Sequence, residues 1–204
     1  MFLRSVSALA ILASAIASPG AAQTAPAAAP APAAAPAEVR IAQAGTLAPG
    51  AVADIKDATG KTIGRVFFYD GPRGMLLRIE VGGMPPGWHG IHLHDKGVCT
   101  APDFASAGGH INPGRKSHGL LHAQGAEAGD LPSFFVGAGG IGRTSVFTDL
   151  VSARGTGGRP ALLDADGSSV VIHAAPDDQS SQPTGGSGAR IACGVIAAPP
   201  AAAG

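Results

Sequence analysis

The sequence predicts an all-β fold, a Greek-key antiparallel β-sandwich or flattened barrel of the immunoglobulin-like kind, with two long functional loops. Glycine is abundant, with 31 among 204 residues, and only 14% of the residues are charged. No long window shows the 3.6-residue periodicity of an amphipathic helix, whereas residues 75–81 alternate inward and outward side chains with a period of two. We therefore expect a sheet of short strands joined by turns.

The expected strands lie close together in the first half of the domain and far apart in the second. Residues 70–74, Asp-Gly-Pro-Arg-Gly, are typical of a tight turn between two strands. The segments expected to form strands are 51–56, 62–69, 75–81, 89–94, 143–148, 169–173 and 190–196. Two Gly-rich segments, 97–142 and 174–188, separate the later strands. Loops of such length are uncommon in a compact domain unless they are functional or cross-linked.

The first 22 residues have the pattern of a secretory signal peptide. Arg4 precedes a short apolar run, and small residues follow, so that cleavage is expected after Ala17 or Ala22. The apolar run is too short to cross a bilayer as a helix. We therefore expect a periplasmic protein, with no membrane insertion after the signal peptide has been cleaved.

The next segment, 23–38, consists almost only of Ala and Pro, and we expect it to be a disordered, extended linker. The remaining residues, 39–204, are enough for one domain. The formal net charge is zero at pH 7 and no basic run is present, so nucleic acid is not an expected partner. In an exported chain, the two cysteines, Cys99 and Cys193, are expected to form one disulfide.

The densest group of candidate metal ligands is the segment 88–94, Trp-His-Gly-Ile-His-Leu-His. In an extended strand, His92 and His94 project to the same face, where two imidazoles can hold copper, zinc, iron or nickel. The same alternation sends His89 to the opposite face. Further candidates lie downstream, at His110, His118, His122, Asp130, His173 and Asp177. Nitrogen and oxygen ligands spread along a Gly/Pro-rich loop could wrap a second ion.

With these residues in this order, the chain resembles the copper–zinc superoxide dismutase family in its bacterial exported form. The resemblance covers most of residues 45–197 and rests on six blocks in the family's order. The blocks are residues 89–94 (HGIHLH), 107–113 (AGGHINP), 118–119 (HG), 128–132 (AGDLP), 171–178 (VIHAAPDD) and 188–196 (GARIACGVI).

The resemblance implies one copper and one zinc per subunit, and it allows a homodimer. The implied copper ligands are His92, His94, His110 and His173, and His110 would bridge as an imidazolate to a zinc that His118 and Asp130 also hold. Asp177 would tie a copper histidine to a zinc histidine, and Arg190 would hold the anionic substrate. The Cys99–Cys193 disulfide would anchor the loop near Arg190, and His89 would be a structural hydrogen bonder.

The chain departs from the family at the third zinc ligand, since Glu127 stands where the family has a histidine. Three readings remain open: Glu127 replaces the imidazole, His122 is recruited instead, or zinc is absent and copper works alone. The loop before Arg190 also carries no charge from Gln179 to Ala189. Steering of a substrate anion would then rest on Arg190, with Lys96, Arg115 or Lys116 as further candidates.

The function implied is a dismutase that converts superoxide to dioxygen and hydrogen peroxide and so defends against extracytoplasmic superoxide. Arg190 is permanently charged, so it can orient the anion without changing its own protonation state. Two alternatives are a non-enzymatic periplasmic copper/zinc-binding protein and a copper-only dismutase with a degenerate zinc site. An anion-binding arginine beside an open metal position favours the enzyme, because a metal buffer has no need of one.

Overall fold

The structure is a computed structural model, and it describes residues 48–200 of the chain. The expected signal peptide (1–22) and linker (23–38) lie outside the described residues and stay predictions. None of the helical segments in the described part of the chain has the length and apolar character needed to cross a membrane.

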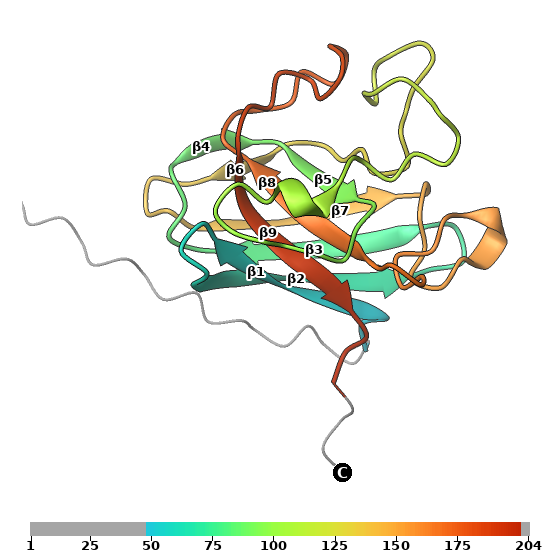
Figure 1. The fold of residues 1–204 in the computed structure, drawn as a ribbon, viewed down its shortest axis with the longest axis horizontal. Coiled ribbons are helices and arrows are strands. Elements are labelled where there is room, and N and C mark those ends of the chain that lie inside the picture. Colours follow the sequence, from blue (N-terminus) through green and yellow to red (C-terminus); the bar gives the residue numbers. More distant parts are fainter. Residues whose placement is uncertain (1–47, 201–204) are drawn as a thin grey trace, which may run out of the picture. The chain divides into compact units, whose positions relative to one another are not determined.

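The described residues are organised as strands, with two short 3-10 helices in the connections (Figure 1). The strands are β1 (Ala51–Asp57), β2 (Thr62–Asp70), β3 (Met75–Val81), β4 (Gly87–His89), β5 (Ile91–His94), β6 (Phe134–Val136), β7 (Gly142–Thr148), β8 (Ser168–His173) and β9 (Arg190–Ala197). The 3-10 helices are η1 (Ala105–Ala107) and η2 (Thr156–Gly158). Six of the seven segments expected to form strands do so with small shifts at their ends, and the seventh, 89–94, is divided between β4 and β5.

One curled sheet dominates the domain (Figure 1). Its strand order is β5-β8-β9-β1-β2-β3-β7, and β4 and β6 form a separate two-stranded sheet. Every strand pair is antiparallel, and the last strand, β9, returns to lie beside the first, β1. The predicted antiparallel sandwich or flattened barrel is therefore confirmed.

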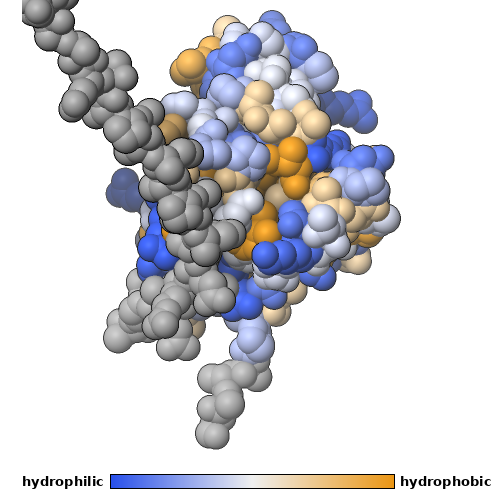
Figure 2. Space-filling view, turned by 90° about the vertical axis from the view of Figure 1, so that its left-hand side faces the viewer, coloured by the Kyte–Doolittle hydropathy of each residue, from blue (hydrophilic) through white to orange (hydrophobic). Residues whose placement is uncertain are grey.

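The core lies on the inner face of this sheet, because alternate residues of each strand point inward. In β3, Leu77, Ile79 and Val81 have no exposed surface, and in β2 Phe68 is equally buried. Hydrophilic residues cover much of the outside on the face shown in Figure 2, with hydrophobic residues gathered in small groups. The sheet thus forms a rigid base from which two long connections project, residues 95–133 and 174–189.

The expected single strand over 89–94 is wrong in one respect, since the chain forms two strands that are interrupted at Gly90. His89 in β4 pairs with β6, whereas β5 pairs with β8. Gly90 joins the two, donating its N–H to the Ala175 carbonyl and accepting from the N–H of His173. Strand β6 was not expected, because three residues are too few to show an alternating pattern.

Candidate metal centre

Four histidine rings meet at the end of the sheet where β5 and β8 lie side by side. His92 and His94 come from β5, His173 ends β8, and His110 pairs with His94 across an isolated antiparallel bridge. The ring centroids of His92 and His110 are 4.2 Å apart, and those of His92 and His173 are 4.8 Å apart. The sheet register therefore places three imidazoles, and a loop adds the fourth.

Hydrogen bonds to backbone carbonyls fix the orientation of two of these rings. His94 Nδ1 lies 3.0 Å from the Gly108 carbonyl oxygen, and His173 Nδ1 lies 3.0 Å from that of Gly188. A carbonyl only accepts, so each Nδ1 carries the proton and each Nε2 presents a lone pair. Burial lowers the pKa of His94 to about 2 and that of His173 to about 4, so both rings are neutral near pH 7.

The remaining ring nitrogens converge on one point. His92 Nδ1 and the Nε2 atoms of His94, His110 and His173 are buried and have no hydrogen-bond partner within residues 48–200. One ligand atom from each of the four lies within 4.8 Å of the others. Buried polar atoms without partners are costly and rare. Four imidazole nitrogens left open in this way fit a bound copper ion.

A second group of ligand atoms lies directly against the first and shares His110. The group consists of His110, His118, Glu127 and Asp130. His110 Nδ1 lies 2.6 Å from Glu127 Oε2, and His118 Nδ1 lies 2.8 Å from Asp130 Oδ1. His110 Nδ1 is also 3.3 Å from Asp130 Oδ1. Two imidazole nitrogens and two carboxylate oxygens form a donor set suited to zinc.

The two carboxylates of this group are held by backbone and side-chain donors. Asp130 Oδ2 accepts hydrogen bonds from the N–H groups of Gly119 (2.7 Å) and Glu127 (2.9 Å), which leaves Oδ1 facing the histidines. Asn112 Nδ2 donates to Glu127 Oε1 at 2.7 Å, so Oε2 points toward His110. Gly129 permits the close approach of the loop to β5, because an added Cβ would lie 2.1 Å from the carbonyl oxygen of Leu93.

The carboxylates of the second group raise the pKa of His110, the histidine that the two groups share. Burial acts to lower the pKa of His110, but hydrogen bonds to Asp130 and Glu127 outweigh it and raise the pKa to about 9. The metal-free protein therefore holds a proton on His110 at pH 7, in the place where a metal would bind.

Asp177 links the two groups from outside. Its Oδ2 accepts from His92 Nε2 at 2.6 Å, and its Oδ1 lies 3.2 Å from His118 Nε2. Burial acts to raise the pKa of Asp177, but the bonds from His92, the Gln179 N–H and His118 outweigh it and lower the pKa to about 2. Asp177 is thus a carboxylate that orients one histidine of each group.

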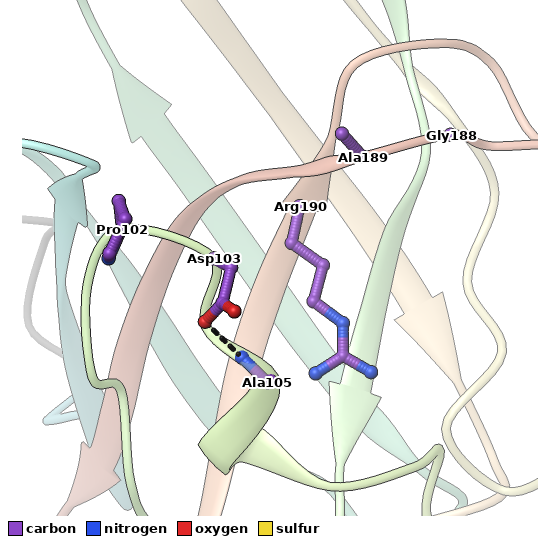
Figure 3. Close-up of a pocket in the computed structure, with 6 residues that line it drawn as sticks. All are labelled: Pro102, Asp103, Ala105, Gly188, Ala189 and Arg190. Atoms are coloured by element: carbon purple, nitrogen blue, oxygen red, sulfur yellow. Dashed lines mark hydrogen bonds between the residues drawn. The ribbon is translucent and has the colours of Figure 1, made fainter.

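Arg190 opens β9 next to the first group. Its Nη1 donates to the Phe104 carbonyl at 2.8 Å and its Nη2 to the Gly108 carbonyl at 2.7 Å. Gly108 thus orients both Arg190 and His94. Figure 3 shows Arg190 and Asp103 on opposite sides of a pocket. That pocket is lined by Pro102, Asp103, Ala105, Gly188, Ala189 and Arg190.

The expected disulfide between Cys99 and Cys193 is confirmed, with 5.7 Å between the two Cα atoms. It joins the first long loop to β9. Phe104 packs with the buried Cys193 in a small cluster, and Cys99 packs against this cluster. Because Phe104 also supplies one of the carbonyls that hold Arg190, the disulfide fixes the loop beside the guanidinium.

The two other histidines examined in the sequence have separate roles. His89 uses both ring nitrogens, at 2.7 Å from the His173 carbonyl and 2.8 Å from that of Pro85. His122 Nδ1 accepts from the Gln124 N–H at 3.1 Å, and no ligand group within residues 48–200 includes His122. The structure therefore brings Glu127, and not His122, to the second group.

The sequence analysis did not identify Gly108, Asn112 or Gln182, which hold the ligands in place. Gly108 contributes a carbonyl and Asn112 an amide, as described above. Gln182 contacts the backbone of His118. Gly108 and Asn112 lie in the block 107–113 that carries the family resemblance, but nothing in that block indicates their contacts, and no local pattern marks Gln182.

The family model described as copper/zinc superoxide dismutase (SODC) matches residues 62–196. The chain belongs to the copper/zinc superoxide dismutase family. Copper and zinc are the cofactors that this membership implies, and the two ligand groups fit them. The family expected from the sequence is confirmed.

Individual relatives agree with this family. The chain is 51% identical to a superoxide dismutase [Cu-Zn] of Caulobacter vibrioides over 147 residues. The aligned region covers 72% of this chain and 84% of the relative. A crystal structure of a superoxide-dismutase-like protein from Bacillus subtilis is 37% identical, with a TM-score of 0.69 over 72% of this chain and 99% of that one. The Cu/Zn superoxide dismutase of Brucella abortus is 29% identical, with a TM-score of 0.59 over 72% of this chain and 98% of that one.

Proposed function

We propose that this chain is a superoxide dismutase whose two ligand groups bind copper and zinc. Copper would be held by His92, His94, His110 and His173. Zinc would be held by His110, His118, Glu127 and Asp130. The four buried, unpartnered imidazole nitrogens carry this proposal, because they are costly in a metal-free protein and suit a copper ion.

Copper bound there supplies the one-electron exchange of the reaction, in which one superoxide is oxidised to dioxygen and a second, with two protons, is reduced to hydrogen peroxide. Arg190 attracts and orients the anion, since its charge is permanent and only two of its five N–H groups are used by Phe104 and Gly108. His110 faces the copper group through Nε2 and the carboxylates through Nδ1. Nε2 would either bind copper or hold a proton, so His110 could supply one of the two protons whenever its bond to copper is open.

The arrangement around Arg190 favours the enzyme over a metal-storage protein. Two elements converge to hold this one guanidinium beside the copper group: β9, which carries Arg190, and the disulfide-anchored loop, which supplies the Phe104 and Gly108 carbonyls. Metal storage requires no anion-binding site. The position of Glu127 within the second group likewise favours a zinc-containing dismutase over a copper-only one.

A superoxide-consumption assay on copper- and zinc-loaded protein tests the proposal, with Arg190→Ala as the variant. We expect rapid consumption by the wild-type protein and a loss of about tenfold or more in the variant, because a single well-placed charge accelerates association of an anion by that order. Arg154→Ala, which removes an exposed arginine, is the matched control and should leave the rate unchanged. Bound metal without superoxide consumption would establish the storage function instead.

We further propose that the chain is exported to the periplasm through cleavage of residues 1–22, and that residues 39–204 form the mature catalytic domain. The disulfide supports this proposal, because such bonds persist in oxidising compartments. Amino-terminal sequencing of the protein from a periplasmic fraction tests it. An uncleaved amino terminus in the cytoplasmic fraction would contradict export.

A further inference from the structure

The two long connections meet over the zinc group, and one side chain there contacts a metal-ligand residue through its backbone. Gln182 Oε1 accepts from the His118 N–H at 3.0 Å. Gln182 Nε2 donates to the His118 carbonyl at 2.9 Å. A single amide thus satisfies both backbone polar groups of His118, 64 residues away in the sequence. Such two-point pairing fixes the direction of the peptide on each side of the ligand.

Gln179 also joins the two long connections, through hydrogen bonds to residues that follow His118 in the sequence. Its Nε2 donates to the Leu131 carbonyl at 3.0 Å, and its own carbonyl accepts from the Leu121 N–H at 3.1 Å. The backbones are also in direct contact at Gly119, where an added Cβ would lie 2.2 Å from the Gln179 carbonyl oxygen. The segment from Gln179 to Gln182 is therefore in direct contact with the part of the first long connection that carries the proposed zinc ligands, residues 110–131, called the zinc loop below.

We propose that Gln182 is a positioning residue for zinc, which holds the backbone of His118 so that its Nδ1 faces Asp130 and its Nε2 faces Asp177. The inference rests on the zinc site of the proposed function. His118 must satisfy two carboxylates on different segments at once, at 2.8 Å through Nδ1 and 3.2 Å through Nε2. A small rotation of the backbone would break both contacts.

The backbone of His118 needs the hydrogen bonds from Gln182 because its own loop contains little regular structure. His118 lies between Ser117 and Gly119 in a part of the connection, residues 108–133, that forms no strand or helix, and Gly119 has a φ of +111°. Ordering such a flexible stretch costs conformational entropy, and a tie that is already present in the metal-free protein removes that cost from the binding of zinc. Gln182 therefore increases zinc retention without contacting the ion.

The chemistry of the tie also matters, because residues 179–189 carry no charge. Residues 179–182 contact the connection 95–133 through amides and backbone groups, which salt does not screen as it screens ion pairs. The contribution of Gln182 to zinc retention should therefore change little between low and high ionic strength.

The test is the rate of zinc loss to a chelator from copper-free, zinc-loaded protein. Gln182→Ala should lose zinc about 10-fold faster than the wild type, the lower end of the effect of outer hydrogen-bond partners on metal affinity. Gln124→Ala is the matched control, because Gln124 is an exposed glutamine in the same zinc loop, and it should behave as wild type. Cobalt(II) in the zinc site provides a spectroscopic signature, and its visible bands should shift in Gln182→Ala alone.

A merely structural role would change the melting temperature of the metal-free protein and leave the cobalt spectrum and the zinc-loss rate as in the control. Gln182→Glu tests the same point in a second variant, since a carboxylate cannot donate to the His118 carbonyl. In the wild-type protein without metal, the His118 amide should also exchange its hydrogen slowly. Equal zinc loss from the Gln182 and Gln124 variants, or fast exchange at His118, would overturn the inference. Absence of zinc binding by the wild type would instead refute the proposed zinc site, and with it the role of Gln182.

Discussion

The two halves of the metal centre are built from different parts of the fold. Three of the four histidines proposed to bind copper, His92, His94 and His173, lie on β5 and β8 within the sheet. All four proposed zinc ligands lie in the connection between β5 and β6, residues 95–133. The copper half thus inherits its geometry from strand pairing, whereas the zinc half has to be assembled from a loop.

The difference shows in what holds each ligand. On the copper side, strand register and backbone carbonyls hold His94 and His173, and the Asp177 carboxylate adds one hydrogen bond to His92. On the zinc side, individual side chains do this work: Asn112 orients Glu127, Asp177 orients His118, and Gln182 holds the backbone of His118. The copper half should therefore tolerate substitutions in the connection 95–133 other than at His110, whereas single substitutions there should disable the zinc half.

The largest expected effect comes from His110, the one residue that both halves share. His110→Ala removes a ligand from each ion, so retention of both metals should fall by more than the roughly 100-fold that loss of an outer hydrogen-bond partner costs. His118→Ala should reduce zinc alone. Copper and zinc contents after dialysis against a chelator measure both variants. Intact copper in His110→Ala would show that the halves are independent.

The next effect isolates the zinc half at Glu127. Glu127→Ala should lower zinc affinity by about 100-fold or more while copper is retained, since the strand-borne ligands remain in place. Glu127→His, which introduces the histidine of the family, should keep zinc. His122→Ala is the control, because its ring lies outside both groups of the described residues. Competition titrations with a zinc chelator measure the affinities, and zinc loss in His122→Ala would reverse the assignment.

The pH dependence of the metal-free protein should also differ between the halves. His110 has its pKa raised from 6.5 to about 9, so its proton stabilises the folded state fully below about pH 6.5, and this stabilisation is lost as the pH rises through 9. Zinc must displace that proton, so binding should release about one proton from His110 near pH 7 and progressively fewer above pH 9.

His94 and His173, with pKa values of about 2 and 4, are already neutral near pH 7, so metal binding should release no proton from either ring. Calorimetry in buffers of different ionisation enthalpy counts the protons, and Glu127→Gln should reduce the release because His110 loses a carboxylate partner. Proton release that stays constant from pH 6 to above pH 9 would contradict the assignment to His110.

The smallest effect concerns the approach of the substrate to the copper half. Asp103 lines the same pocket as Arg190, so this pocket combines one cation with one anion (Figure 3). Lys96 lies outside the lining of this pocket and is paired with Asp166. Asp103→Asn should raise the rate of superoxide consumption about twofold at low salt, since the field of one exposed charge is modest in water. Asp149→Asn serves as a control for net charge. A slower Asp103→Asn variant would assign Asp103 a positioning role instead.

The difference between the strand-borne half and the loop-borne half also explains which features of the fold and of the site could be predicted from the sequence. The alternation of β3 and the His92-x-His94 spacing are local, so the strands and the shared face of two imidazoles could be predicted from the residues themselves. The interruption at Gly90 could not, because it depends on His89 pairing with β6 across 45 residues of chain. The choice between Glu127 and His122 depends on the path of a loop, and the contact of Gln182 with His118 spans two loops. No periodicity encodes such contacts.

The most direct test of the account is a crystal structure of the copper- and zinc-loaded protein, with anomalous scattering recorded at both metal edges. The account predicts zinc at about 2.0–2.2 Å from Nδ1 of His110 and His118 and from carboxylate oxygens of Glu127 and Asp130. Copper should lie on the opposite side of His110, bound to the nitrogens that are buried without partners. Zinc bound through His122, or a copper-only centre with Glu127 turned away, would contradict the account.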